Sequence, residues 1–219
     1  MALLTDTHWE AVDPKMRALM RHIGTADFSP RFYLAGGTAL ALQLGHRFSI
    51  DLDFFSKDDE VKEATHLEIL SALRHLTPTA KERTTGNLLL EINGIAVGFF
   101  GYGYPLIGES VSAEGISLAS IQDIGLMKLD ALATRGSRKD FYDAYFILQQ
   151  VSLEDLLERG KQKYSFYRDF PLTTLKYMVQ FDNADRDVQP DLLIPVEWDA
   201  VKKFFVQQAK RLGQNWFGL

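Results

Sequence analysis

The spacing of apolar residues predicts two amphipathic helices in the first third of the chain. Between His8 and Ile23, apolar side chains recur every three or four residues, which is the period of a helix with one buried face. They are Val12, Met16, Leu19, Met20 and Ile23. A second such helix is expected from Asp59 to Leu76, because Pro78 stops it. Its expected inner face consists of Val61, Ala64, Leu67, Leu70 and Leu73.

Four short apolar or alternating runs are typical of strands. They are residues 32–35, 50–55, 88–92 and 95–100. Asn93-Gly94 separates the last two, which is a strong signal for a tight β-hairpin. After the first strand, Gly36-Gly37 leads into a short helix predicted from Thr38 to Leu44 and closed by Gly45.

The pattern changes after residue 100. The segment 101–118 is rich in glycine and proline and is read as irregular, with a domain boundary near its end. Ser120 then opens a helical region, with Asp123 three residues later as a variant capping box. Helices are expected at 120–134, 138–150, 152–165, 171–180 and 196–212, with a loop at 182–195.

These elements predict an α+β fold. An N-terminal mixed sheet with flanking helices occupies residues 1–118, and a helical domain at 119–219 is expected to complete the active-site cleft. Composition agrees with a globular chain: of 219 residues, 46% are hydrophobic and 24% charged.

Charge and cysteine content narrow the possible functions. The net charge of -5 does not steer the chain towards nucleic acid, so any such site must be a local basic patch. With no cysteine, disulfides, thiolate metal sites and cysteine nucleophiles are excluded. There is neither a long apolar run nor a signal-peptide pattern, so we expect a cytoplasmic protein without a membrane partner.

The informative segment is GGTALALQLGHRFSIDLDFF, residues 36–55. On a strand, Asp51 and Asp53 point to one side and Leu52 to the other. Two adjacent carboxylates repel each other unless a cation lies between them, and Mg²⁺ prefers such oxygen ligands together with substrate phosphates. The glycines let the backbone approach a phosphate at the start of a helix.

Each part alone is weak evidence, since an isolated Asp-x-Asp is most often a surface feature. The combination is more specific: a strand, Gly36-Gly37, a helix and a second strand with Asp51 and Asp53. It predicts in-line phosphoryl transfer, in which positioning and charge neutralisation supply most of the catalysis.

These motifs resemble a known family. Residues 34–55, LAGGTALALQLGHRFSIDLDFF, are similar to the AbiEii/AbiGii toxin family within the DNA polymerase β-type nucleotidyltransferases. Residues 128–148, KLDALATRGSRKDFYDAYFIL, resemble that family's downstream signature of a lysine helix and an Arg/Lys-Asp-x-x-Asp helix. The resemblance implies NTP as substrate, Mg²⁺, and in several members a toxin paired with an antitoxin. Some members transfer nucleotides to tRNA acceptor ends.

Lys128 is the expected catalytic and triphosphate-binding cation of the helical half. Helical spacing places Arg135 on the same side as Lys128. The alternative is that both are solvated cations on an exposed face. On the next helix, Asp143 is favoured as an inward-facing catalytic residue, whereas Asp140 is expected to stabilise the helix N-terminus or form surface salt bridges.

Other residues are assigned to substrate binding. Gly36, Gly37 and Thr38 are expected to bind the nucleotide, together with Arg47 and Ser49 in the turn before the Asp strand. Arg47 could instead be a counter-ion for Asp51 or Asp53, and His46 is read as a packing residue. An RNA contact is expected from Arg135, Arg138 and Lys139.

One position departs from the family pattern. By resemblance, a third carboxylate is expected near position 98, where this chain has Gly98, with Glu91 as a weak substitute. The favoured function is Mg²⁺-dependent transfer of NMP from NTP to RNA, plausibly tRNA, by a toxin. The alternatives are a nucleotide-binding regulatory module with weak or no activity, favoured by Gly98, and a nucleotidyltransferase acting on a small molecule.

Overall fold

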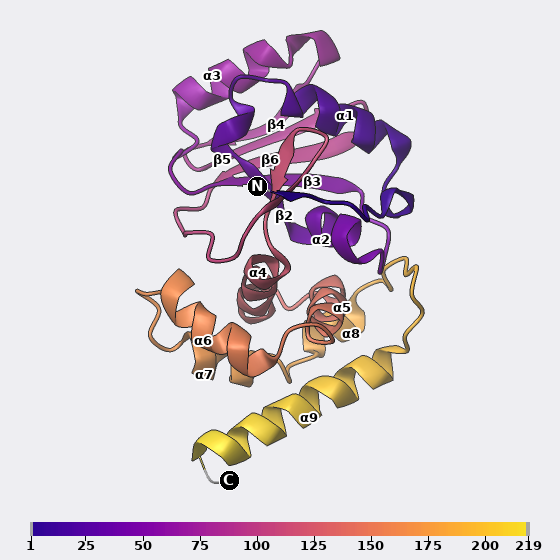
Figure 1. Cartoon of the computed structure of the whole chain (residues 1–219), viewed down its shortest axis with the longest axis vertical. Helices are drawn as coiled ribbons and strands as arrows, with labels where there is room; N and C mark the ends of the chain where they lie inside the picture. Colours follow the sequence, from indigo (N-terminus) through magenta and orange to yellow (C-terminus); the bar gives the residue numbers. More distant parts are fainter. Residues whose placement is uncertain (1, 218–219) are drawn as a thin grey trace. The chain divides into compact units, whose positions relative to one another are not determined.

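The computed structural model describes residues 2–217, which form two compact units (Figure 1). The first unit ends at Ser120 and the second begins at Ile121. All the strands belong to the first unit, and the second unit contains helices α4 to α9. Among the described residues, no helix is long and apolar enough to cross a membrane.

The first unit is built on an eight-stranded mixed sheet with the order β1-β7-β8-β2-β3-β6-β5-β4. This confirms the expected α+β class. The strands are β1 (Ala2–Leu3), β2 (Tyr33–Ala35), β3 (Asp51–Ser56), β4 (Thr79–Thr84), β5 (Asn87–Ile92), β6 (Ile95–Gly101), β7 (Val111–Ala113) and β8 (Ile116–Leu118).

The centre of the sheet holds the strands predicted from the sequence. β3 pairs antiparallel with β2 and parallel with β6, and β6 pairs antiparallel with β5. The hairpin prediction is confirmed, because Ile92 pairs with Ile95. Asn93 and Gly94 both have positive φ, at 52° and 80°. That is the requirement of the two-residue turn for which Asn-Gly is selected.

Three helices flank the sheet: α1 (Pro14–Gly24), α2 (Gly36–Leu44) and α3 (Glu63–Ala72). In Figure 1, α1 and α3 lie together over one face of the sheet. The predicted helix start at His8 is wrong. A short 3-10 turn, Trp9–Ala11, comes first, and Asp13 then caps α1 by accepting a hydrogen bond from the Lys15 amide at 2.7 Å.

The predicted inner face of this helix is only partly right: Val61 and Leu73 are buried as expected. Ala64 and Leu67 are exposed, whereas Thr65, His66 and Ile69 are buried. The helix begins four residues later than expected, after Val61, whose φ of 46° breaks the helical path. A helical pattern counted from Asp59 therefore places Ala64 and Leu67 on the buried face, whereas both are exposed.

Four strands escaped prediction. β4 is exposed at every position, and its sequence, TAKERT, has three consecutive charged residues and no apolar period to detect. β1, β7 and β8 have only two or three residues each, and the latter two lie in or next to the segment read as irregular. Their pairing with each other and with β2 depends on partners that are distant in sequence.

Buried aromatic rings form the core behind the sheet. Phe99 packs edge-to-face on Phe28 and Phe32, with centroids 5.6 and 5.3 Å away, and stacks on Phe54 at 5.1 Å. Phe54 and Phe99 are the register partners of β3 and β6. These rings hold β3 rigidly and leave its other face for the carboxylates.

The second unit consists of α4 (Ile121–Thr134), α5 (Arg138–Ile147), α6 (Leu153–Lys163), α7 (Phe170–Tyr177), α8 (Asp182–Arg186) and α9 (Trp198–Phe217). The helices expected here are present, and the one element not expected is α8, inside the segment read as a loop. Phe141 of α5 is central to the core, with ring contacts to Phe181, Trp198 and Phe205.

Candidate functional site

The two carboxylates of β3 share one face of the strand. Leu52 and Phe54 are buried at 0% and 1% exposure, whereas Asp51 and Asp53 are half-buried. The alternation therefore has the period-two pattern expected from the sequence. An apolar layer behind the strand fixes two adjacent acidic groups at the partly open face.

Gly36 forms the junction between β2 and α2, next to Asp53. Its φ is 68°, in the left-handed region that favours glycine, and α2 begins here rather than at Thr38 as predicted. A Cβ atom on Gly36 would lie 3.1 Å from Asp53 Oδ2. Ala35 and Asp53 are also register partners. The glycine thus lets the start of a helix and a carboxylate approach each other closely.

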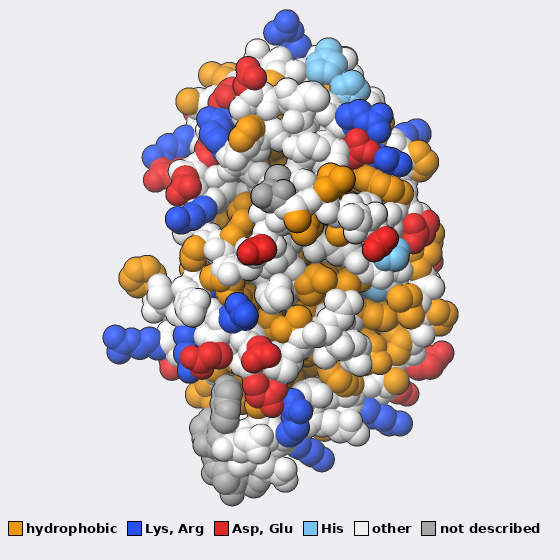
Figure 2. Space-filling view, viewed as in Figure 1, with side chains coloured by type: hydrophobic (Ala, Val, Ile, Leu, Met, Phe, Trp, Pro, Cys, Tyr) orange, Lys and Arg blue, Asp and Glu red, His pale blue; other side chains and the backbone are white. Residues whose placement is uncertain are grey.

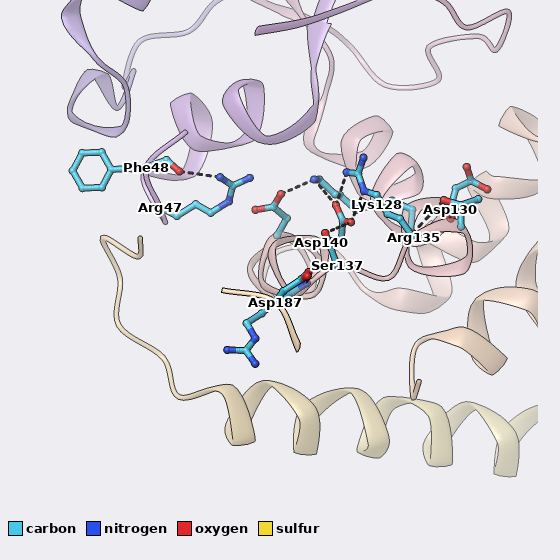
Figure 3. A network of polar contacts seen from close by, with 12 residues as sticks. Arg47, Phe48, Lys128, Asp130, Arg135, Ser137, Asp140 and Asp187 are labelled. Carbon is cyan, nitrogen blue, oxygen red and sulfur yellow. Dashed lines mark hydrogen bonds and ion pairs between the residues drawn. The ribbon is translucent and has the colours of Figure 1, made fainter. Parts of the chain in front are cut away.

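The Arg47 side chain lies against the second glycine. A Cβ atom on Gly37 would stand 2.2 Å from one terminal nitrogen of Arg47. The other terminal nitrogen donates to the Phe48 carbonyl at 2.8 Å, as Figure 3 shows. Arg47 is only 6% exposed. Its guanidinium is therefore fixed beside the first turn of α2, where backbone N–H groups and the helix dipole favour an anion.

Thr38 and Ser49 are buried and bind each other rather than pointing outwards. The Thr38 hydroxyl donates to the backbone carbonyl of Asp51, and it is hydrogen-bonded to the Ser49 hydroxyl at 2.8 Å. Their exposures are 2% and 7%. Both hydroxyls tie α2 to the start of β3, so they position Asp51. His46 is fully buried, as expected for a packing residue.

Gly98 lies directly beside Asp53, because the two residues are register partners on β6 and β3. A Cβ atom here would be 3.3 Å from Asp53 Oδ1, but only 2.5 Å from the ring of Phe100. The space of the missing third carboxylate is therefore occupied by an aromatic ring. Glu91 does not replace it: it lies one strand further away, opposite Ala96, and forms an ion pair with Lys81 at 3.1 Å.

Asp51 and Asp53 fit a hard divalent cation. Two neighbouring carboxylates beside a phosphate-sized glycine junction match the way Mg²⁺ is held by one or two carboxylates and substrate oxygens. Among the residues that the structure describes, no cluster of three or more acidic, histidine or cysteine side chains could form a complete protein cage. A cation at this site would therefore depend on the substrate for its remaining ligands.

The second unit contains a network of four charged residues, of which Lys128, Asp140 and Asp143 are buried and Arg135 is exposed (Figure 3). Lys128 Nζ of α4 lies 2.9 Å from Asp140 Oδ1 and 2.6 Å from Asp143 Oδ2 of α5. Arg135 binds Asp140 through two nitrogens, at 2.6 and 2.7 Å, and Ser137 Oγ donates to it at 2.5 Å. Two cations and two carboxylates balance, which is the condition for burying charges at tolerable cost.

This network corrects two expectations. Lys128 is 4% exposed, so it is not a solvated surface cation. Asp140 lies in the first turn of α5, as expected, but it is fully buried, as is Asp143, and it is the centre of the network rather than a surface group. Arg135 does share a side with Lys128, as predicted, because both bind Asp140.

Burial alone would raise the pKa of Asp140, but the charges of Lys128 and Arg135 and the hydrogen bonds from Arg135 and Ser137 hold it well below its usual range. Because the folded state lowers this pKa, the network stabilises the chain above about pH 4, the ordinary carboxyl range, and the contribution is lost as pH falls further.

We therefore expect Asp140→Asn to flatten the acid limb of the stability curve. Wild type should lose stability between about pH 5 and 3, and the variant, less stable at pH 7, should lose less over that range. Urea denaturation followed by circular dichroism at each pH measures both curves. Parallel acid limbs would contradict this role for Asp140.

The expected RNA contacts are only partly available. Arg138 Nε donates to the Ala184 carbonyl at 2.7 Å, and another of its nitrogens donates to the Asp185 carbonyl at 3.0 Å. Arg138 thus ties α5 to α8, and Arg135 binds Asp140, whereas Lys139 is an exposed cation on the same helix as Arg138. On the face shown in Figure 2, basic and acidic side chains are interspersed.

A second buried ion pair was missed by sequence reasoning. Lys163 Nζ of α6 donates to Asp123 Oδ1 of α4 at 2.8 Å, and both side chains are fully buried. Burial lowers the pKa of Lys163, although the bond to Asp123 opposes this. The capping-box reading of Asp123 did not foresee this pair. The two residues are 40 positions apart, and no local pattern signals such a pair.

The model of one family matches most of the chain. The model of the family described as nucleotidyl transferase AbiEii toxin, Type IV TA system, matches residues 17–215. A protein from Aquifex aeolicus (strain VF5) is 37% identical over 191 residues, covering 84% of this chain and 89% of its own length.

Two solved structures are similar in fold. The nucleotidyltransferase toxin MenT4 from Mycobacterium tuberculosis H37Rv has a TM-score of 0.58 at 18% identity, covering 90% of this chain and 83% of its own. A crystal structure from Helicobacter pylori has a TM-score of 0.56 at 20% identity, covering 95% and 94%.

Proposed function

The chain belongs to the AbiEii family of nucleotidyl transferase toxins, and from this premise we propose that it moves NMP from an NTP to an RNA acceptor, with tRNA as the acceptor class. Nucleotidyl transfer follows from the family. The RNA acceptor, the use of Mg²⁺ and the partner are the proposal.

The observation that carries the proposal is the arrangement on β3. The Asp53 carboxylate lies against Gly36 at the helix junction, and the Arg47 guanidinium lies against Gly37. A triphosphate bound at the glycines would meet backbone N–H groups and a fixed cation. Asp51 and Asp53 then lie beside its α-phosphorus, where two carboxylates are useful only if they hold a cation.

The reaction is an in-line displacement. The acceptor hydroxyl oxygen bonds to the α-phosphorus, the bond to the β-phosphate bridging oxygen breaks, and pyrophosphate leaves. When bound, Mg²⁺ neutralises charge on the phosphates. This chain's own residues hold and orient the triphosphate through Gly36, Gly37 and Arg47, while Thr38 and Ser49 fix the strand that carries Asp51.

Lys128 and Asp143 belong to the second unit, and their predicted roles in triphosphate binding and catalysis stay predictions. They form a preformed pair at 2.6 Å. Lys139 remains the candidate for a phosphate contact with RNA.

The biological role proposed is that of a toxin. The family description refers to a toxin–antitoxin system, and MenT4 is named as a nucleotidyltransferase toxin. A cognate antitoxin is therefore the expected partner. Induced expression should arrest bacterial growth in the wild type and not in Asp53→Asn, and co-expression of the neighbouring gene should relieve the arrest.

The reaction is tested by incubating the chain with total tRNA, Mg²⁺ and each labelled NTP in turn. Label on RNA that disappears with Asp53→Asn supports the proposal. NTP binding without label on RNA favours the alternative of a nucleotide-binding regulatory module, which the Phe100 ring in the third-carboxylate position supports. Label on small hydroxylated metabolites instead would assign a different acceptor.

Gly37→Ala should weaken NTP binding while the fold persists. The new methyl group must displace the Arg47 guanidinium. Because this group is the far end of a flexible side chain, it can move while the fold persists, and the substitution weakens anion binding instead. A hydrogen bond to a charged group is worth about 1.5–3 kcal/mol, so we expect affinity to fall about tenfold or more. Calorimetry with Mg·NTP measures the change.

The matched control is Gly213→Ala, because a Cβ atom at Gly213 meets nothing within 4 Å. That variant should bind NTP like the wild type. Equal affinities for Gly37→Ala and the wild type would remove Arg47 and the glycine junction from the binding site.

A further inference from the structure

A row of aromatic side chains crosses the sheet on the same face as the carboxylates. Tyr33, Phe55 and Phe100 lie side by side on β2, β3 and β6, because Tyr33 pairs with Phe55 and Phe55 with Phe100. Their rings are stacked, with centroids 6.1 Å apart for Tyr33 and Phe55, and 5.0 Å apart for Phe55 and Phe100.

This row is adjacent to Asp53. Asp53 and Gly98 precede Phe55 and Phe100 by two residues on the parallel strands β3 and β6, and Ala35 follows Tyr33 by two residues on the antiparallel strand β2. Two residues correspond to roughly 7 Å along the sheet. The Phe100 ring leans back over Gly98, next to the Asp53 carboxylate. The aromatic row therefore lies next to the proposed reaction centre at Asp53.

Tyr33 is buried at 5% exposure, but Phe55 and Phe100 are not part of the hydrophobic core. The core rings of these strands, Phe54 and Phe99, lie on the opposite face at 1% and 0% exposure. Phe55 and Phe100 are only half-buried. Two partly exposed phenylalanines beside a carboxylate pair are a costly arrangement for a surface that has no ligand, because an apolar ring gains most from burial.

We propose that Phe55 and Phe100 form a stacking site for a nucleobase, and this inference rests on the proposed transfer of NMP from NTP. Every base has a π-face, so stacking on an aromatic side chain binds nucleotides with little regard to sequence. The site would take the base that adjoins the reacting phosphorus or hydroxyl.

The expected direction of the reaction favours the terminal base of the acceptor as the base that stacks on Phe55 and Phe100. Gly36 and Gly37 lie at the opposite side of Asp53 from the aromatic row, since β3 runs from Asp51 through Asp53 to Phe55. If pyrophosphate leaves towards the glycines, the attacking hydroxyl enters from the side of the row. A terminal nucleoside has a ring to stack there, whereas a polyhydroxylated small molecule has none.

The same geometry accounts for Gly98. Any larger residue would collide with the Phe100 ring, at 2.5 Å from the new Cβ. The chain has an aromatic ring over the position where the family resemblance implies a carboxylate. The Phe100 ring that would stack on the base is therefore also the group that fills the space of that carboxylate.

The test compares ligands with and without a base. The first pair is ATP and inorganic tripolyphosphate with Mg²⁺, measured by calorimetry. The second pair is a fluorescent RNA hairpin with a single-stranded 3′ end and the same hairpin with an abasic 3′-terminal ribose, measured by anisotropy. Variants are Phe100→Leu and Phe55→Leu, with Phe100→Tyr to retain a ring.

Phe166→Leu is the matched control, because this ring is 98% exposed and lies in the second unit. We expect the leucine variants to lose about fivefold or more affinity for the base-containing ligand of one pair, with no change for its base-free partner. Phe166→Leu should behave like the wild type, and Phe100→Tyr, which keeps a ring, should lose less affinity than Phe100→Leu.

The pair that responds identifies the source of the base. Loss for the natural hairpin places the acceptor's base on the row, and loss for ATP places the nucleotide's base there. Unchanged affinities in both pairs would overturn the stacking site, even if labelling of RNA succeeds. Failure of the wild type to bind Mg·NTP or label RNA would instead count against the proposed function.

Discussion

Replacing Lys128 with methionine is expected to lower the free energy of unfolding by about 3–5 kcal/mol. The ammonium group is buried between Asp140 and Asp143, at 2.9 and 2.6 Å, and both carboxylates are fully buried. Methionine preserves the volume of the side chain but removes the charge. The carboxylates lose a charged partner that water cannot replace, because the site is closed.

Urea denaturation at pH 7 measures this change, and Lys139→Met provides the comparison on a neighbouring exposed lysine. The control should change stability by less than about 0.5 kcal/mol. Adding Asp143→Asn to Lys128→Met should restore part of the loss, because it removes the carboxylate closest to the missing charge. A Lys128→Met variant as stable as the wild type would show that the network does not support the fold.

This result decides how Lys128 is studied. A lysine held by two carboxylates has a structural role that exists without any nucleotide. Loss of activity in Lys128→Met is therefore evidence for triphosphate binding only under conditions where the variant remains folded. NTP affinity at low temperature, with folding monitored in the same sample, separates the two roles.

The carboxylate strand was predictable from sequence because its signals are local. The alternation of Asp51, Leu52, Asp53 and Phe54 sets the two faces of β3 without reference to any partner. The Asn93-Gly94 turn and the Gly45 helix end, where φ is 61°, are likewise fixed by single residues.

Side chains that bind distant partners were less predictable. Helical spacing placed Lys128 and Arg135 on one side, but it could not show that Asp140 is the residue they share. The pair of Lys163 and Asp123 depends on how α4 and α6 pack. Sequence alone cannot predict that a charged residue is buried, because the residue that neutralises it lies on another element.

The short and exposed strands could not be found for a different reason. β4 presents no buried residue at all, so neither its composition nor its period distinguishes it from a loop. It is a strand because β5 offers it a ladder of backbone partners. Likewise, the ring over Gly98 follows from the register of β6 and the Phe100 side chain, whereas the sequence shows only a missing carboxylate.

Asp53→Asn is expected to lower the rate of nucleotidyl transfer by at least about a hundredfold, because stabilisation of charge by a bound metal is worth several kcal/mol. Asparagine keeps the shape of the side chain and removes the charge that would hold a cation. Since Asp51 and Asp53 are adjacent, half-exposed and alike in charge, removing one relieves repulsion, and the stability should stay within about 0.5 kcal/mol of the wild type.

The dependence on Mg²⁺ separates loss of metal binding from a general effect of the substitution. In the wild type, NTP affinity should fall when EDTA replaces Mg²⁺, whereas Asp53→Asn and Asp51→Asn should bind weakly in both conditions. Asp58→Asn, an exposed acid five residues further along, is the control and should keep both the affinity and its response to Mg²⁺.

If the wild type bound NTP equally well with Mg²⁺ and with EDTA, Asp51 and Asp53 would not be metal ligands. The activity would then have to rest on Arg47 and the glycine junction alone, a site with enough charge to hold a triphosphate but without a group to offset the negative charge of the transition state.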